Sequence, residues 1–279
     1  MIALIATGIA VWIAALVGPD SPVRNAAVDS LVAAGDVQAT SQAVYDTNWR
    51  GREGLIQALE RMGAVGELAG IAERHTKLDA KRLAIRSLGR SGKPDARVPL
   101  RLLLTSENRD LAAEGLGLVG DATDIVRVRA LLSDDRSEVR RRAALALVGL
   151  HDERALDALA ELLGDPNHAV RFGVYPPLLQ AGQPGAAAVW RVYPGLPAPG
   201  RQLALRLFGD LRYQPARDML EKSVAEGPWP VQLSAVRAIG AWGKAEGIDV
   251  LKKAARHVSS PIVQAAIRDA LAQLQKAGE

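Results

Sequence analysis

The chain has 279 residues, no cysteine and a formal net charge of +4, with 48% apolar and 4% aromatic residues. The absence of cysteine excludes disulfides, thiolate metal sites and cysteine nucleophiles, and it does not indicate the cellular compartment of the protein. Because acidic and basic residues alternate along the chain, this charge indicates solvated helix faces more than a nucleic-acid groove.

The N-terminal segment, residues 2–18, carries no charged side chain, and Thr7 is its one polar side chain. A helix of this length reaches about 25 Å, the short end of a membrane span. We therefore expect residues 1–18 to be a membrane anchor, or to contact a membrane-embedded subunit, as a single span of undetermined orientation. The side chains expected against the membrane are Ile2, Leu4, Ile5, Ile9, Trp12, Ile13 and Leu16.

Two alternatives to the membrane anchor stay open. The segment is the first helix of the first repeat, because residues 21–35 form a helix that needs a partner. Alternatively, it is a cleaved signal peptide, although no lysine or arginine precedes the apolar run.

Residues 19–279 repeat one unit of two helices. One residue at an equivalent position of each repeat, which we call the anchor, defines the register of the repeats. The anchors are Arg24, Arg52, Lys81, Arg109, Arg140, Arg171, Arg201, Gln232 and Gln264. Successive anchors are 28 to 32 residues apart, and the residues three and seven positions after each anchor are all apolar. This spacing places them on one face of a helix, and a fixed period near thirty predicts a repeat array.

The ends of the repeated helices carry turn and cap signals. Residues 133–137 and 164–168 are rich in Asp, Asn, Ser and Pro, which end one helix and cap the next. Glycine stands eleven positions after the anchor in six repeats, where we predict a left-handed helix cap. These glycines are Gly35, Gly63, Gly92, Gly120, Gly182 and Gly243.

The pattern D-P-x-x-x-V-R-x-x-A-x-x-A-L is clearest from Asp165 to Leu178 and from Asp135 to Leu147. It resembles the HEAT-like repeats, specifically the short type that is also found in phycobilisome lyases. Over residues 20–279 the resemblance implies an all-α fold, a right-handed α-solenoid of about nine helical hairpins. It also implies a scaffold that binds other macromolecules, with the partner on the second helices of the hairpins.

The repeat is irregular over residues 175–200. Pro176 and Pro177 fall inside a predicted helix, which we expect to be kinked or split. Aromatic residues gather around this interruption, and such residues are enriched at binding hot spots. The predicted partner-binding residues are Tyr175, Trp190, Tyr193, Arg201, Trp229 and Trp242. The alternative for Trp190 and Trp242 is that they fill space between irregular repeats.

The anchor arginines are predicted to be structural. Acidic residues lie four to six positions before several of them, and where the turn lacks an acid the anchor is Gln232 or Gln264. We therefore expect each arginine to pair with the acid of its own turn. Arg201 has no such acid, which makes it the one anchor that is a binding candidate.

No pattern in the chain predicts catalysis. The four histidines are far apart in sequence and outside any metal-binding motif, and no nucleophile elbow or phosphate-binding loop occurs. We predict a non-catalytic protein–protein interaction scaffold without metal or cofactor, as a membrane-tethered accessory subunit of a larger complex. Two alternatives remain, a nucleic-acid-binding HEAT protein and a bilin-lyase-like chromophore enzyme.

Overall fold

The structure is a computed structural model that describes residues 2–242 and 246–276. Within these residues the chain forms eighteen α-helices and no strand, which confirms the predicted all-α fold. The helices pair in sequence order into hairpins, and we call the first helix of each hairpin the A helix and the second the B helix. The chain divides into two compact units, Met1–Asp152 and Glu153–Glu279.

The N-terminal unit contains five hairpins among its described residues. Its A helices are α1 (Ile2–Val17), α3 (Val37–Asp46), α5 (Val65–Arg74), α7 (Arg97–Leu103) and α9 (Ile125–Ala130). Its B helices are α2 (Ser21–Ala34), α4 (Trp49–Met62), α6 (Leu78–Arg90), α8 (Arg109–Val119) and α10 (Ser137–Gly149). Short 3-10 helices flank α7 and α9, namely η1 (Pro94–Ala96), η2 (Ala122–Asp124) and η3 (Leu131–Ser133).

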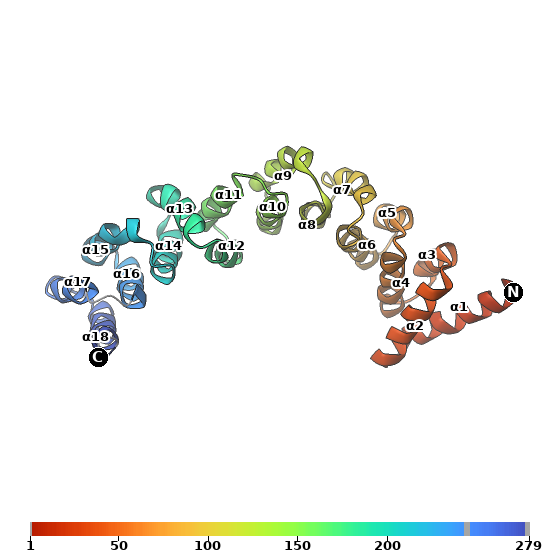
Figure 1. Ribbon diagram of the computed structural model, residues 1–279, viewed down its shortest axis with the longest axis horizontal. Coiled ribbons are helices and arrows are strands. Elements are labelled where there is room, and N and C mark those ends of the chain that lie inside the picture. The colour runs from red at the N-terminus through yellow and green to blue at the C-terminus, as the bar shows by residue number, and fades with distance from the viewer. Residues whose placement is uncertain (1, 243–245, 277–279) are drawn as a thin grey trace. The chain divides into compact units, whose positions relative to one another are not determined.

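The C-terminal unit contains four hairpins among its described residues. Its A helices are α11 (Ala155–Glu161), α13 (Gln183–Val192), α15 (Arg217–Glu226) and α17 (Glu246–Ala254). Its B helices are α12 (His168–Gln180), α14 (Ala198–Asp210), α16 (Trp229–Trp242) and α18 (Pro261–Lys276). The 3-10 helices are η4 (Leu162–Gly164), η5 (Tyr193–Gly195) and η6 (Gln214–Ala216). In each unit the A helices form one layer and the B helices the other (Figure 1).

The core lies between these layers and follows the repeat register. Of the eighteen apolar residues predicted three and seven positions after the anchors, seventeen are buried, and Leu271 is partly buried. Because B helices face both the A layer and the neighbouring B helices, alanine at the first position lets the helices approach while leucine at the second fills the interior.

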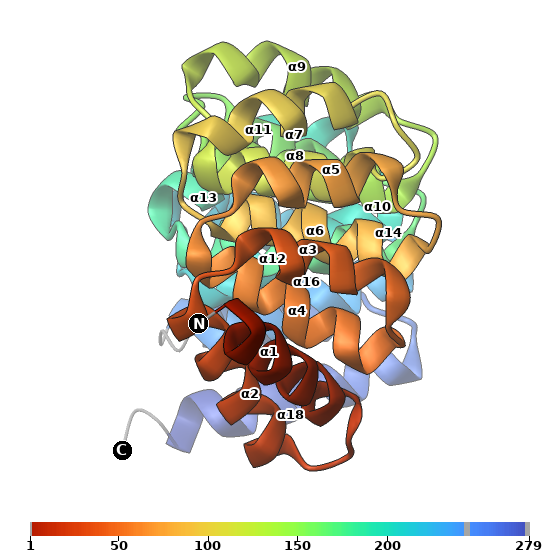
Figure 2. The ribbon, with the colours of Figure 1, turned by 90° about the vertical axis from the view of Figure 1, so that its right-hand side faces the viewer.

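Helix α1 is the A helix of the first hairpin. Leu16 is fully buried, and a Cβ atom on Gly54 of α4 would lie 2.6 Å from the Leu16 Cδ2 atom, so the two helices pack closely. Ile9 is also buried, while Trp12 and Ile13 are partly exposed. Figure 2 views this unit from α1 and α2, the hairpin at its end. The first alternative drawn from the sequence, a first repeat helix, therefore describes the packing of α1.

The predicted single membrane span is wrong. No helix in the described part of the chain has the length and apolar character that crossing a bilayer requires. Helix α1 has 16 residues, fewer than the roughly 20 that a span needs. Of the predicted membrane contacts, Ile9 and Leu16 are instead used in packing within the unit, and the side chains of Ile2, Leu4 and Ile5 lie outside the described residues.

The residue eleven positions after the anchor has a positive φ angle in most repeats. Gly35 and Gly63 are left-handed helix caps, as predicted, with φ angles of 68° and 70°. Gly92 has a φ of 65°, whereas Gly182 combines a φ of 63° with a ψ of −134° and is not a left-handed α cap. Gly120 has a φ of −67° and ends its helix differently. Gly243 lies outside the described residues. His151 and Arg212, which stand at the same position of their repeats, also have positive φ, at 56° and 50°.

Anchor side chains tie each B helix to the turn before it. Arg24, Arg140 and Arg171 each donate from Nη1 to the carbonyl oxygens five and six residues earlier, at 2.6 to 3.0 Å. Arg201 donates to the carbonyl five residues earlier at 2.7 Å, and the Gln264 amide to the carbonyl six residues earlier at 2.8 Å. A neutral amide can replace the guanidinium because the acceptor is a backbone carbonyl.

The prediction that an anchor pairs with the acid of its own turn is wrong for Arg52, and Arg109 also binds an acid outside its own turn. Arg52 binds the Asp79 carboxylate at 2.7 Å, and Arg109 Nη2 donates to Asp134 Oδ1 at 3.0 Å. Both carboxylates belong to the next repeat, so these ion pairs connect neighbouring hairpins. The hydrogen bond from Arg109 holds the pKa of Asp134 below its ordinary value.

Helix α12 is one continuous helix from His168 to Gln180, with Pro176 and Pro177 inside it. The predicted split is therefore absent. Gln180 is followed by a turn in which the Ala181 N–H donates to the Pro177 carbonyl at 3.0 Å, which closes the helix after the prolines.

Candidate functional site

The two layers of the C-terminal unit differ in charge. Its B helices contain six basic and two acidic residues, a net charge of +4, whereas its A helices contain five basic and seven acidic residues, a net charge of −2. Since charged residues on a repeat protein lie on its solvated faces, the B layer favours an anionic partner.

A groove of about 560 Å³ crosses this B layer, between α12, α14 and α16. Phe172 of α12 lines it and keeps 56% of its surface exposed, while Leu203 of α14 is buried beneath it. Ser234 and Arg237 of α16 stand on its other wall. An exposed aromatic ring beside cationic and hydroxyl groups can contact an apolar side chain and hydrogen-bond to polar groups of the same ligand.

One arginine of the groove is held in place by its neighbours. Arg206 lies 3.6 Å from the Asp210 carboxylate and 5.4 Å from the centre of the Tyr175 ring. The Tyr175 hydroxyl donates to Asp210 at 2.8 Å, and burial together with this hydrogen bond raises the pKa of Tyr175. A cation–π contact and an ion pair of this kind restrict the rotamers of Arg206, which lowers the entropy lost when it binds a ligand.

Arg237 is the groove's available cation. It stands five residues after its repeat's anchor, as Arg206 does in the preceding repeat. Arg237 is exposed and has no ion-pair partner among the residues that the structure describes. Arg171, in contrast, is used to cap its own turn. A carboxylate of a partner can therefore reach Arg237 without breaking an internal ion pair.

The predicted partner-binding aromatics divide into buried and exposed residues. Tyr175 and Trp242 are buried, and Trp190 packs against Phe208 with ring centres 5.9 Å apart. Tyr193 is partly buried. These contacts are those of the space-filling alternative.

Trp229 and Arg201 are more accessible. Trp229 keeps 51% of its surface exposed at the start of α16. Arg201 is exposed as a residue, but its Nε atom donates to the Leu196 carbonyl, so it performs the capping role of the other anchors. Neither residue lines the groove. The partner-binding role of these predicted residues stays a prediction.

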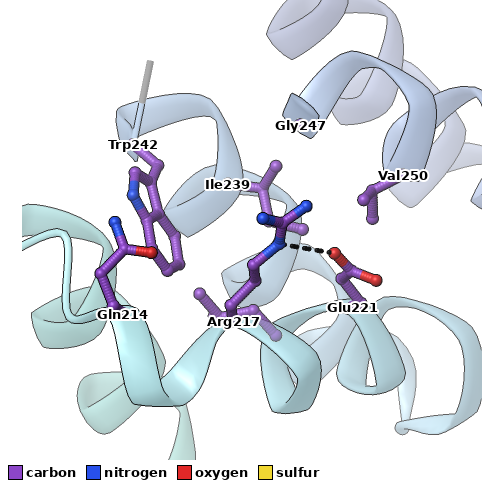
Figure 3. Close-up of a pocket in the computed structure, with 8 residues that line it drawn as sticks. Gln214, Arg217, Glu221, Ile239, Trp242, Gly247 and Val250 are labelled. Atoms are coloured by element: carbon purple, nitrogen blue, oxygen red, sulfur yellow. Dashed lines mark hydrogen bonds and ion pairs between the residues drawn. The ribbon is translucent and has the colours of Figure 1, made fainter. Parts of the chain in front are cut away.

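A smaller pocket is lined by Trp242 of α16, Gln214 of η6 and Val250 of α17 (Figure 3). Its volume is about 30 Å³, room for one or two water molecules. The Trp242 Nε1 atom has no hydrogen-bond partner among the described residues, and an ordered water in this pocket would satisfy it. At this size the pocket is a packing defect, and the groove is the better candidate site.

In the B layer of the N-terminal unit, Arg82 and Arg142 form ion pairs with an acidic residue of the same layer. Buried Asp110 of α8 lies 3.7 Å from Arg82 of α6 and 3.6 Å from Arg142 of α10. Arg142 also binds Glu138 at 2.7 Å. These ion pairs connect three successive B helices. Burial lowers the pKa of Arg142, and the nearby Asp110 offsets part of this effect.

Sequence reasoning missed the groove residues Phe172, Arg206 and Arg237. The signal that could have found them is the register, since Arg206 and Arg237 hold equivalent positions in successive repeats. Phe172 follows the anchor Arg171 directly, where other repeats carry mostly polar or small residues. Among the described residues no group of His, Asp and Glu has an arrangement that could hold a metal ion.

The two-layered stack of hairpins defines a helical-repeat protein of the α-solenoid class. Residues 67–147 and 126–189 match the family model described as HEAT repeats. The predicted resemblance is thereby confirmed. The matched region is a little under half of the chain. Among curated proteins, none matches the sequence of this chain.

Solved structures of similar fold include enzymes. Human deoxyhypusine hydroxylase in complex with glycerol is 19% identical, with 92% of this chain and 100% of that chain covered and a TM-score of 0.40. The CpcE–CpcF complex of phycocyanin lyase from Nostoc sp. PCC7120 is 17% identical, with 94% and 93% covered and a TM-score of 0.40. These likenesses are too distant to transfer an activity to this chain.

Proposed function

We propose that this chain is a non-catalytic protein-interaction scaffold that holds an acidic segment of a partner protein in the groove of its C-terminal B layer. The observation that carries the proposal is the exposed Phe172 ring in the same groove as Arg237, a cation without an ion-pair partner among the described residues. Aromatic and arginine side chains together are typical of interface hot spots.

The expected ligand follows from this pair. A carboxylate in the partner would form a charge-assisted hydrogen bond with Arg237, and a neighbouring apolar side chain would cover Phe172. Asp210 limits the number of acidic groups that fit, because a carboxylate beside it is repelled. We therefore infer a segment in which an apolar residue is flanked by few acids instead of a long acidic run.

A nucleic-acid ligand is the second candidate, favoured by the net charge of +4 on the B helices of this unit. It would contact Arg206, Arg237 and the exposed Arg268 of α18 through phosphates. Binding of that kind falls steeply with salt, whereas a peptide held by one ion pair and an apolar contact depends on salt far less.

To test the proposal, peptides that bind the full chain are selected from a random displayed library. Their binding is then measured to variants of the chain that lack the groove contacts. The double variant Phe172→Asp, Arg237→Glu should lose the selected peptides. The control is Leu118→Ala with Arg268→Glu, which changes one exposed apolar and one exposed basic B-layer residue outside the groove. Peptides without acidic enrichment, or retained by the groove variant, would refute the proposal. A salt-sensitive affinity for single-stranded DNA alone would favour the second candidate.

A further inference from the structure

Outward positions of two A helices in the N-terminal unit carry apolar residues. In α7, Val98 and Leu102 are 60% and 73% exposed. In α9, the next A helix, Val126 is 75% exposed. Single exposed apolar residues are common, but here they recur on neighbouring helices of one layer. Figure 1 shows α5, α7 and α9 following one another in this layer.

The same positions are charged in α15 of the other unit. Aligning buried Leu100 of α7 with buried Leu220 of α15 places Val98 opposite Asp218 and Leu102 opposite Lys222. Both helices begin after a 3-10 turn, η1 and η6, that ends in a buried alanine. Helix α15 thus shows that this hairpin type tolerates charge at both positions, so the apolar residues of α7 are not required by the fold.

Val98 and Leu102 line a groove of about 500 Å³ between α5 and α7. Val65 and Ala69 of α5 form one wall, and Val98 and Leu102 of α7 form the other. The i and i+4 spacing of Val98 and Leu102 presents two side chains on one face of α7. A groove between two helices with apolar walls fits the apolar face of a third helix.

The charged residues of this groove are acidic. Glu73 of α5 and Asp95 of η1 line it, and the lining contains no basic residue. Glu73 lies 3.6 Å from the exposed Arg74 beside it, whereas Asp95 has no ion-pair partner among the described residues. The nearby basic side chains of α7 are already used, since Arg97 binds Asp121 at 2.9 Å and Arg101 binds Asp124 at 2.6 Å. The groove therefore favours a cationic occupant over an anionic one.

We propose that the α5–α7 groove is a second docking site, independent of the C-terminal groove, for an amphipathic helix of a partner protein that carries lysine or arginine beside its apolar face. Leucine-sized side chains of that helix insert between Ala69 and Leu102. Its basic residues reach Glu73 and Asp95. The two grooves then have opposite charge preference, so the chain can hold two different partner segments at once.

The test measures binding of a synthetic amphipathic helical peptide made of leucine and lysine to the full chain by fluorescence anisotropy. A peptide of the same pattern with glutamate in place of lysine is the charge control. The test variant is Val98→Asp with Leu102→Lys, the residues that α15 carries at these positions. A second variant, Asp95→Asn, removes one acid without changing the apolar walls.

The lysine peptide should bind the wild-type chain and lose about tenfold in affinity with the Val98→Asp, Leu102→Lys variant, the size expected for removal of an interface anchor. Asp95→Asn should weaken it less, and Phe172→Asp in the other unit should leave it unchanged. Thermal unfolding of the variants checks that they fold. Equal binding of the two peptides, or equal binding to the groove variant, would overturn the proposal. So would binding only to anionic phospholipid vesicles and to neither peptide.

Discussion

Arg212 and Gly63 both have a positive φ angle, of 50° and 70°, and both stand eleven residues after the anchor of their repeat. Glycine takes this conformation without steric cost, whereas a side chain with a Cβ atom is strained by roughly 1 kcal/mol. The repeat position therefore selects a backbone conformation, and Arg212 occupies it at a cost in stability.

Replacing Arg212 by glycine should raise the free energy of unfolding by about 1 kcal/mol, because the strain is removed. Chemical denaturation of the two proteins measures the difference. Arg212→Ala is the control, since it removes the same side chain but keeps the Cβ atom, and it should bring no such gain. If both variants were equally stable, the arginine side chain and not the backbone would be responsible.

Close helix packing makes a second prediction, at Gly89. A Cβ atom there would lie 2.6 Å from the Gly115 Cα atom of the neighbouring B helix. We expect Gly89→Ala to destabilise the chain by about 1 to 3 kcal/mol, the usual size for overpacking. Gly66→Ala is matched to it, because a Cβ atom at Gly66 meets nothing within 4 Å. The gain in helix propensity should make that variant as stable as the wild type or more so. Equal losses at the two positions would contradict the packing described for α6 and α8.

Acid should weaken the link between neighbouring hairpins. Because Arg109 lowers the pKa of Asp134 in the folded chain, this carboxylate binds a proton less readily there than when unfolded. Its contribution to stability is present above the unfolded pKa and is lost as the pH falls through the lowered folded pKa. Asp134→Asn should be less stable than the wild type at neutral pH and lose less stability on acidification. Unfolding curves from neutral pH to about pH 3 compare them. Parallel pH profiles would show that the pair contributes nothing.

The anchor hydrogen bond can be tested at Arg201, which sequence reasoning assigned to binding. Arg201→Gln keeps an N–H donor, as Gln264 does in the last repeat, and should retain most of the stability. Arg201→Met removes the donor and should cost about 1 kcal/mol, the typical net value of such a hydrogen bond. Thermal denaturation distinguishes the two variants. If Arg201→Gln were as unstable as Arg201→Met, the carbonyl of Leu196 would not be the relevant acceptor.

The repeat register could be predicted because its cause is local. Apolar residues at fixed intervals after the anchor must face the neighbouring helices in every hairpin, and their burial follows that interval. The glycine caps are predictable for the same reason, and His151 and Arg212 show that the position matters more than the residue type.

The candidate site was not predictable in the same way. Trp229 is half exposed and Trp242 is buried, and this difference depends on how neighbouring hairpins pack, which the spacing of residues within one repeat does not determine. The apolar composition of α1 also led to the wrong prediction of a membrane span. An uncharged run of this length suits a membrane, yet Leu16 is buried against Gly54 of a later repeat, a contact that hydropathy alone does not encode.

The most direct test of the proposed function is a double-mutant cycle between Arg237 and an acidic residue of a peptide selected on the full chain. Binding is measured for both forms of the protein, Arg237 and Arg237→Glu, against the acidic peptide and its lysine counterpart. We predict that Arg237→Glu weakens the acidic peptide and that the lysine peptide restores binding to this variant, with a coupling free energy of about 1 kcal/mol or more. Additive effects, with no rescue by the lysine peptide, would contradict an acidic partner segment at this groove.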